Sequence, residues 1–351
     1  MHTSRTLTLA RLPSGVPIRT TVHAYGEGEL VDGDDGPELD APGDGPVVYA
    51  QAAQHGREVN GVAVLRRLHD RLVGNASGSA DAGGASDGPT AADLDGTLVT
   101  VPVADPLTFD RVSYTTPESL DSRQPNMNRC WPGDAEGSLH ERMAARLWRF
   151  AGAADAIVDL HTGSPSMATH AVYMRGDEAC RGLAEAFGTD LLLAEAAGDD
   201  ADTEWDERGF AGKLRVAATR EGIPTITPEL AHSREIVAAA VETGVAGMVG
   251  ALRHEGLLDG EPDPWDGVVA RNHLGRAIAD DSGLFVPEPD LAVGDRVREG
   301  ERVGEVFDPT TFETLQVARA DRDGIAYSVA REATVAAGAT LVGVAERIDG
   351  D

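Results

Sequence analysis

Two histidines and one glutamate stand at the ends of apolar segments, in a pattern that could hold a metal ion. His55 comes just after the run VVYAQAA, and Glu58 follows three residues later across a turn that Gly56 permits. His161 ends a second apolar run, AIVDL. Ligand sites in open α/β sheets lie outside the carboxyl ends of the strands, so these side chains can converge from distant parts of the chain. Two imidazoles and a carboxylate are the ligand set of a catalytic zinc ion, which lowers the pKa of water and polarises a carbonyl oxygen.

Amide hydrolysis at such an ion also needs a proton acceptor and a group that holds an anionic substrate. Glu229 ends the segment GIPTITPE, where it could take a proton from water and pass it to a leaving nitrogen, or could simply cap the next helix. Asn128 and Arg129 offer a neutral donor and a planar cation that matches a carboxylate. Asp159 lies on the same strand face as His161 and could orient its imidazole. Each pattern alone is common, since a histidine at a strand end is more often hydrogen-bonded than bound to metal.

The elements around these residues predict an α/β protein. Apolar runs predict strands over 16–25, 47–51, 98–103, 156–160, 191–194 and 222–230. Helical spacing predicts helices over 61–72, 139–150, 179–187 and 233–252. This alternation indicates a mixed sheet with helices on both faces. The acidic stretch 32–46 is expected to be a solvated loop, and the low-complexity stretch 74–96 a surface insertion without a catalytic role.

The sequence pattern changes after residue 262, where short β-type runs replace the alternation of strands and helices. We therefore predict a catalytic domain over 1–265 and a small all-β domain over 270–351. The segments at 291–300 and 333–341 have similar sequence patterns. Together they resemble half of a biotinyl/lipoyl-type β sandwich. Such modules carry their cofactor on a lysine, and this region has none, which excludes a swinging arm. A lid, a scaffold and an oligomerisation surface are the roles left open.

Composition excludes several classes of protein. The chain has 351 residues and a net charge of −29, which opposes binding to nucleic acids and anionic membranes and is typical of an acidic, salt-adapted or high-GC proteome. Its 41% hydrophobic content is too high for disorder. Two cysteines, Cys130 and Cys180, are too few for a disulfide framework. Without a visible signal segment or membrane-length apolar run, a cytoplasmic protein is expected, with homo-oligomerisation left open.

The segments QHGREVNG, NMNRCWPG, DLHTG and PELA, in this order, resemble the succinylglutamate desuccinylase/aspartoacylase family, whose fold is zinc carboxypeptidase-like. The similarity covers roughly residues 16–252, and the C-terminal β region fits the family's layout. The resemblance implies one zinc ion per chain, bound by His55, Glu58 and His161. It also implies that Glu229 is the general base and acid and that Asn128 and Arg129 hold the substrate.

Two departures from the family pattern concern substrate contacts. The family places an arginine before the NMNR segment to stabilise the carbonyl oxygen, and Tyr114 could fill its slot here. Arg111 and Arg123 are the nearby candidates, of which we favour Arg111. Ala231 stands where the family has a glycine. The predicted function is zinc-dependent hydrolysis of a linear amide bond, which removes the acyl group from a small N-acyl amino acid. The alternatives are a metallocarboxypeptidase acting on peptides and a non-catalytic binding protein that retains the fold.

Overall fold

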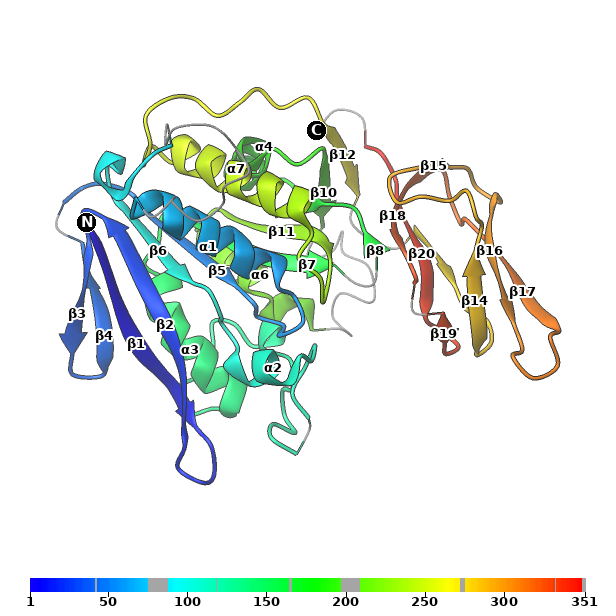
Figure 1. The fold of residues 1–351 in the computed structure, drawn as a ribbon, viewed down its shortest axis with the longest axis horizontal. Helices are drawn as coiled ribbons and strands as arrows, with labels where there is room; N and C mark the ends of the chain where they lie inside the picture. The colour runs from blue at the N-terminus through cyan, green and yellow to red at the C-terminus, as the bar shows by residue number, and fades with distance from the viewer. Residues whose placement is uncertain are drawn as a thin grey trace.

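A nine-stranded mixed sheet is the main element of the computed structural model (Figure 1). The structure describes residues 1–41, 43–74, 88–117, 119–163, 166–196, 209–271, 275–331 and 333–348. In sheet order, the strands are β1 (His2–Arg11), β2 (Pro17–Gly26), β6 (Thr97–Val101), β5 (Val47–Ala52), β7 (Ala156–Gly163), β11 (Thr225–His232), β9 (His170–Met174), β10 (Leu191–Glu195) and β12 (Val268–Arg271). The neighbours β6, β5, β7 and β11 run parallel, so their carboxyl ends meet at one edge of the sheet.

Helices cover both faces of this sheet (Figure 1). They are α1 (Asn60–Leu72), α2 (Pro106–Arg111), α3 (Leu139–Ala151), α4 (Glu178–Phe187), α6 (Leu214–Arg220) and α7 (Ala238–His254). Val48 and Val158 pack in a core with α1, α4 and α7, whereas Tyr49 and Ile157 pack in a second core with α3 and α6. Successive strand residues point to opposite faces, which explains why the central strands are apolar throughout.

The predicted strands and helices of this layer all correspond to observed elements, but several boundaries differ. The helix expected from residue 233 begins only at Ala238, because the buried side chain of Asn60 holds the preceding turn. Its Nδ2 donates to the carbonyl of Leu230 at 2.9 Å, and its Oδ1 accepts from the backbone N–H of Val237 at 2.8 Å. The edge strands β1 and β12, the strand β9 and the short helices α2 and α6 were not predicted.

The acidic stretch 32–46 is not wholly a loop, which corrects the prediction. β3 (Glu29–Gly33) and β4 (Gly36–Asp40) form a hairpin across it. Gly36 adopts a φ of 107° that favours glycine at the turn, and Leu30 is fully buried. Residues 75–87 of the predicted insertion lie outside the described residues.

The C-terminal region consists of two antiparallel sheets around a core of its own. Their strands are β13 (Gly275–Ile278), β14 (Gly283–Pro287), β15 (Arg296–Val297), β16 (Arg302–Phe307), β17 (Thr314–Arg319), β18 (Gly324–Val329), β19 (Thr334–Val335) and β20 (Thr340–Ala345). Two pairings join this region to the rest of the chain: β8 (Ser166–Met167) pairs with β18, and Ala270 of β12 bridges to Arg347. Within the described residues, no helix is both long and apolar enough to cross a membrane.

Candidate metal centre and active site

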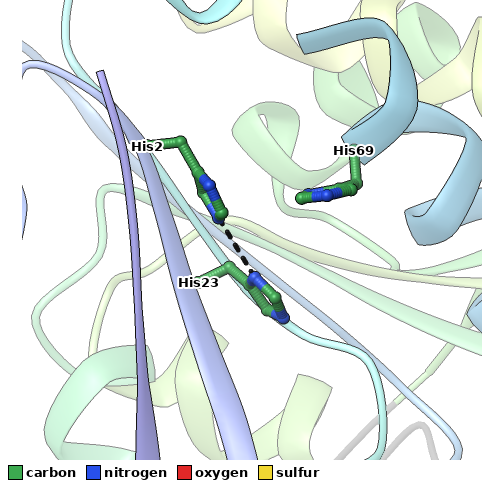
Figure 2. A group of neighbouring side chains, drawn as sticks. All are labelled: His2, His23 and His69. Atoms are coloured by element: carbon green, nitrogen blue, oxygen red, sulfur yellow. Dashed lines mark hydrogen bonds between the residues drawn. The ribbon is translucent and has the colours of Figure 1, made fainter. Parts of the chain in front are cut away.

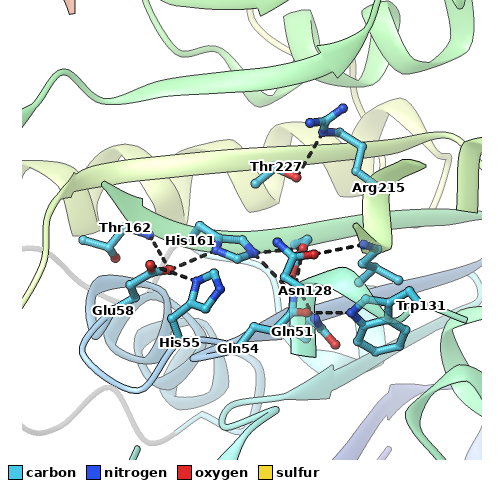
Figure 3. A network of polar contacts seen from close by, with 12 residues as sticks. Gln51, Gln54, His55, Glu58, Asn128, Trp131, His161, Thr162, Arg215 and Thr227 are labelled. Carbon is cyan, nitrogen blue, oxygen red and sulfur yellow. Dashed lines mark hydrogen bonds and ion pairs between the residues drawn. The ribbon is translucent and has the colours of Figure 1, made fainter. Parts of the chain in front are cut away.

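The three residues predicted to bind metal meet in one buried cluster (Figure 3). Nδ1 of His55 lies 2.9 Å from Oε1 of Glu58, and Nδ1 of His161 lies 2.9 Å from Oε2 of the same carboxylate. One potential ligand atom from each residue lies within 4.8 Å of the others. The structure therefore brings together side chains that the sequence separates by more than a hundred positions.

Two parallel strands and a tight turn position the cluster. The register of β5 and β7 pairs Ala52 with Leu160, so the chain leaves β5 beside His161. The turn after β5 returns at once, with the backbone N–H of Glu58 donating to the carbonyl of His55 at 3.0 Å. Gly56 is required in this turn, because a Cβ there would collide with the backbone of Thr108.

The far nitrogen of each imidazole has its own partner. Nε2 of His161 lies 3.0 Å from Oδ2 of Asp159, and Nε2 of His55 lies 3.1 Å from Oδ1 of Asn126. Gln51 in turn donates to Asp159 at 2.9 Å. With a metal ion at Nδ1, these oxygen acceptors would hold the remaining proton of each ring on Nε2. The predicted contact of Asp159 with His161 is thus present.

The donor set fits a divalent cation. When the protons are on Nε2, both Nδ1 atoms and both carboxylate oxygens present lone pairs to one another, an arrangement that a cation between them would stabilise. Burial raises the pKa of Glu58, but His55 and His161 outweigh this effect and lower it to about 2. Burial lowers the pKa of His161, yet Asp159 and Glu58 hold it well above its usual value. Zinc bound here would take the place of the proton that these carboxylates favour on His161, and two imidazoles and a carboxylate form a set that zinc accepts.

Glu229 lies beside this cluster on the next parallel strand. The register of β11 and β7 pairs it with His161. It lies within β11, so it does not cap α7, whose N-cap is Val237. Burial raises the pKa of Glu229 to about 7, because the opposing effect of His161 is partly offset by Glu58. A carboxyl group with this pKa can both accept and donate a proton near neutral pH.

The predicted substrate-binding residues lie on a short 3-10 turn, η2 (Met127–Arg129). Oδ1 of Asn128 accepts from the backbone N–H of Leu214 at 3.0 Å, so its amide NH2 group remains to donate. The guanidinium carbon of Arg129 lies 4.8 Å from the ring centroid of Phe210. Both residues are therefore held against the segment that leads into α6.

That segment carries charged residues that the sequence analysis did not assign to the site. Glu195 is buried between two cations: its Oε1 accepts from Lys213 at 2.9 Å, and its Oε2 accepts from Arg215. Burial lowers the pKa of Lys213 to about 8, although Glu195 opposes the shift. Lys213 is the single lysine of the chain, and this rarity could have marked it as a candidate site residue in the sequence.

The structure places Tyr114, rather than an arginine, against the predicted ligands. Its ring stacks on His55 with 4.0 Å between the centroids. The Arg57 guanidinium lies 4.9 Å from the Tyr114 centroid, and its buried Nε has no hydrogen-bond partner among the described residues. By contrast, the exposed Arg111 donates to the carbonyl of Leu107 in its own helix at 3.1 Å. The Arg123 side chain is 73% exposed and lies 4.0 Å from Glu141.

Comparison with known proteins agrees with this geometry. The model of the succinylglutamate desuccinylase/aspartoacylase catalytic domain matches residues 86–255. Over this segment the chain resembles the succinylglutamate desuccinylase/aspartoacylase family. The matched segment contains Asn128, Arg129, His161 and Glu229, whereas His55 and Glu58 precede it. These matches indicate a hydrolase that acts on amide bonds.

Relatives of the family extend over most of the chain. The N-alpha-acetyl-L-2,4-diaminobutyric acid deacetylase of Halomonas elongata is 29% identical over 326 residues, which cover 88% of this chain and 84% of that protein. The succinylglutamate desuccinylase/aspartoacylase structure of Rhodobacter sphaeroides matches with a TM-score of 0.75 and 22% identity, covering 99% of this chain and 95% of that one. The product-bound ectoine utilization protein EutE of Ruegeria pomeroyi matches with a TM-score of 0.75 and 21% identity, covering 98% and 94%. These structural matches establish the fold.

Proposed function

We propose that this protein is a zinc-dependent deacylase that removes the acyl group from a small N-acyl amino acid. The observation that carries the proposal is the register of β7 and β11, which sets Glu229 beside His161. A proton acceptor thereby adjoins a group of three side chains that fits zinc. This combination is what the hydrolysis of an unactivated amide requires.

The residues of the site have two roles in the proposed reaction, metal binding and proton transfer. His55, Glu58 and His161 would hold zinc, which when bound supplies a Lewis acid that polarises the acyl carbonyl and makes water more acidic. Glu229 takes a proton from the attacking water. It then returns this proton to the amide nitrogen, so that the amino acid departs as a neutral amine. A pKa of about 7 suits both transfers.

Positively charged side chains near the cluster favour the binding of an anionic substrate. The whole chain carries a net charge of −29, which repels carboxylates at long range. Beside the cluster, however, Lys213 and Arg215 flank the carboxylate of Glu195, and Arg129 and Lys213 both lie over the ring of Phe210. We assign these three cations and Asn128 to the carboxylate of the N-acyl amino acid. The deacetylase of Halomonas elongata is named for a substrate of this class.

The partner of the carbonyl oxygen is assigned to Arg111, with Tyr114 as the alternative that the structure adds. Arg111 lies one turn after Thr108, whose backbone packs against Gly56. We expect Arg111→Gln to lower kcat by about 100-fold, because one oxyanion donor is lost. The solvent-exposed Arg123→Gln is the matched control and should keep wild-type turnover. If Arg111→Gln keeps it too and Tyr114→Phe loses it, the assignment passes to Tyr114.

The proposed function is tested with zinc-loaded protein and a panel of N-acetyl and N-succinyl amino acids, alongside short peptides with free carboxyl ends. Release of free amino acid from the acylated compounds, with little cleavage of the peptides, is the expected result. Preferential release of the C-terminal residue from peptides would instead identify a metallocarboxypeptidase. Stoichiometric zinc without hydrolysis of any compound would support a non-catalytic binding protein.

A further inference from the structure

Three histidines outside the active site gather on the face of the sheet that α1 covers (Figure 2). His2 lies on β1, His23 on β2 and His69 in the last turn of α1. One ring nitrogen of each lies within 4.8 Å of the others, and all three residues are half-buried. Nε2 of His2 and Nδ1 of His23 are 3.2 Å apart.

The strand register explains why these rings face one another. His2 pairs directly with Tyr25 across the antiparallel β1–β2 ladder, and His23 precedes Tyr25 by two residues. Alternate residues of a strand share a face, so the three rings stand on the same side of the sheet. α1 packs on this side and brings His69 to the other two rings, at centroid distances of 5.0 Å from His2 and 5.6 Å from His23.

Tyr25 holds two of the imidazoles in place. Its ring stacks on His2 at 4.7 Å between centroids, and its hydroxyl oxygen lies 2.8 Å from Nδ1 of His69. When Nδ1–H of His69 donates to this oxygen, the Nε2 lone pair of His69 is left for another partner. An oxygen acceptor of this kind is what commonly orients a metal-bound histidine.

The charges around the cluster favour neutral imidazoles. Among the described residues, no carboxylate forms an ion pair with His2, His23 or His69. Burial lowers the pKa of His2, and the neighbouring His69 adds to this effect. Burial, together with His2 and His69, lowers the pKa of His23 to about 4. Each neutral ring keeps one nitrogen lone pair that can bind a metal ion.

We infer that His2, His23 and His69 form a second metal site, which binds a divalent cation such as zinc, nickel or copper through three imidazole nitrogens. Imidazole suits these borderline ions, whereas magnesium and calcium require oxygen ligands that the cluster lacks. The net charge of −29 favours cations at the surface in general. The site is distinct from the active site: Asn60, which begins α1 just after Glu58, and His69 are about 14 Å apart along the helix axis.

Such a site would stabilise the packing of an edge strand against α1. β1 lies at the end of the nine-stranded sheet and begins at His2. A cation shared by β1, β2 and α1 would link this edge to the helix that comes after the active-site turn. Because the ligands come together only in the folded chain, binding stabilises the fold.

Metal stoichiometry tests the inference. Metal-free protein is titrated with zinc, and the bound metal is measured after gel filtration by atomic emission. We expect about two equivalents for the wild type, about one each for His23→Gln and His161→Ala, and none for the double variant. The exposed His254→Gln on α7 is the matched control and should keep both equivalents.

Two further measurements keep the test decisive if His161→Ala folds poorly. Copper should show nitrogen couplings from both sites by electron paramagnetic resonance, and His23→Gln should remove only the component from the second site. His23→Gln should also keep wild-type hydrolysis of N-acyl amino acids, which separates this site from the proposed function. A wild type that binds one equivalent, unaffected by His23→Gln and lost on His161→Ala, would overturn the inference.

Discussion

Glu229 illustrates how position on a neighbouring strand defines a residue's chemistry. Its carboxyl group has a pKa raised to about 7 by burial, and its backbone is paired with that of His161. The same glutamate on a solvated loop would titrate near its ordinary value and could not return a proton to a leaving amine at neutral pH.

Replacing Glu229 by glutamine separates proton transfer from metal binding. Glu229→Gln should keep the metal content of the wild type, because Glu229 lies outside the three-ligand cluster, and should lower kcat by about 100- to 10,000-fold. In the wild type, kcat should rise with pH through about 7, since the deprotonated carboxylate accepts the proton. The variant should lose this limb of the profile. Unchanged turnover would remove Glu229 from the mechanism.

We propose that Asp159 is a positioning residue that acts through His161. Its carboxylate accepts from Nε2 of that ring at 3.0 Å and is itself held by Gln51. Asp159→Asn should weaken zinc binding by about 10- to 100-fold, because an amide holds the Nε2–H less strongly. Competition with a chromophoric chelator measures this affinity. Asp177→Asn, at the N-cap of α4, is a control that should leave zinc affinity unchanged.

At the scale of elements, the turn after β5 determines whether the ligands converge. It contains Ala53 at a φ of 49° and packs Gly56 against α2, where the Thr108 backbone leaves no space for a side chain. β5 and β7 supply the frame, but this turn carries Glu58 back toward both imidazoles.

A methyl group at Gly56 should therefore distort the turn that positions His55 and Glu58. Gly56→Ala should lower the free energy of unfolding by about 1–3 kcal/mol, through overpacking, and should reduce bound zinc. Thermal unfolding by circular dichroism and metal analysis measure the two effects. Gly88→Ala is the matched control, because the nearest atom to its Cβ would be 4.0 Å away, on Arg71. Equal unfolding temperatures for the two variants would contradict the packing argument.

For the molecule as a whole, the charge of −29 sets a dependence on salt. Like charges repel across the folded surface, and raising salt from 0.1 to 1 M shortens the screening length from about 10 Å to about 3 Å. We expect the unfolding temperature to rise by several degrees and the KM for an anionic substrate to fall severalfold. Choline chloride at the same ionic strength should act like potassium chloride if screening is the cause. A KM that rises with salt would contradict the argument.

Local patterns in the sequence determined the chemistry and the approximate frame. The apolar runs before His55 and His161 predict parallel strands, and parallel strands deliver the residues after them to one edge of the sheet. The residue types at that edge then predict a metal-assisted hydrolysis. Inferences of this kind succeed because strand formation and side-chain type are properties of short segments.

Tertiary structure alone decided which distant side chains touch. The pairing of Lys213 and Arg215 with Glu195, the stacking of Tyr114 on His55 and the grouping of the three histidines depend on strand order, register and helix placement. No short segment encodes these features, because they arise when separate elements pack together and bury their shared apolar faces. For the same reason the residues of the metal cluster could be named in advance, whereas the orientation of each imidazole could not.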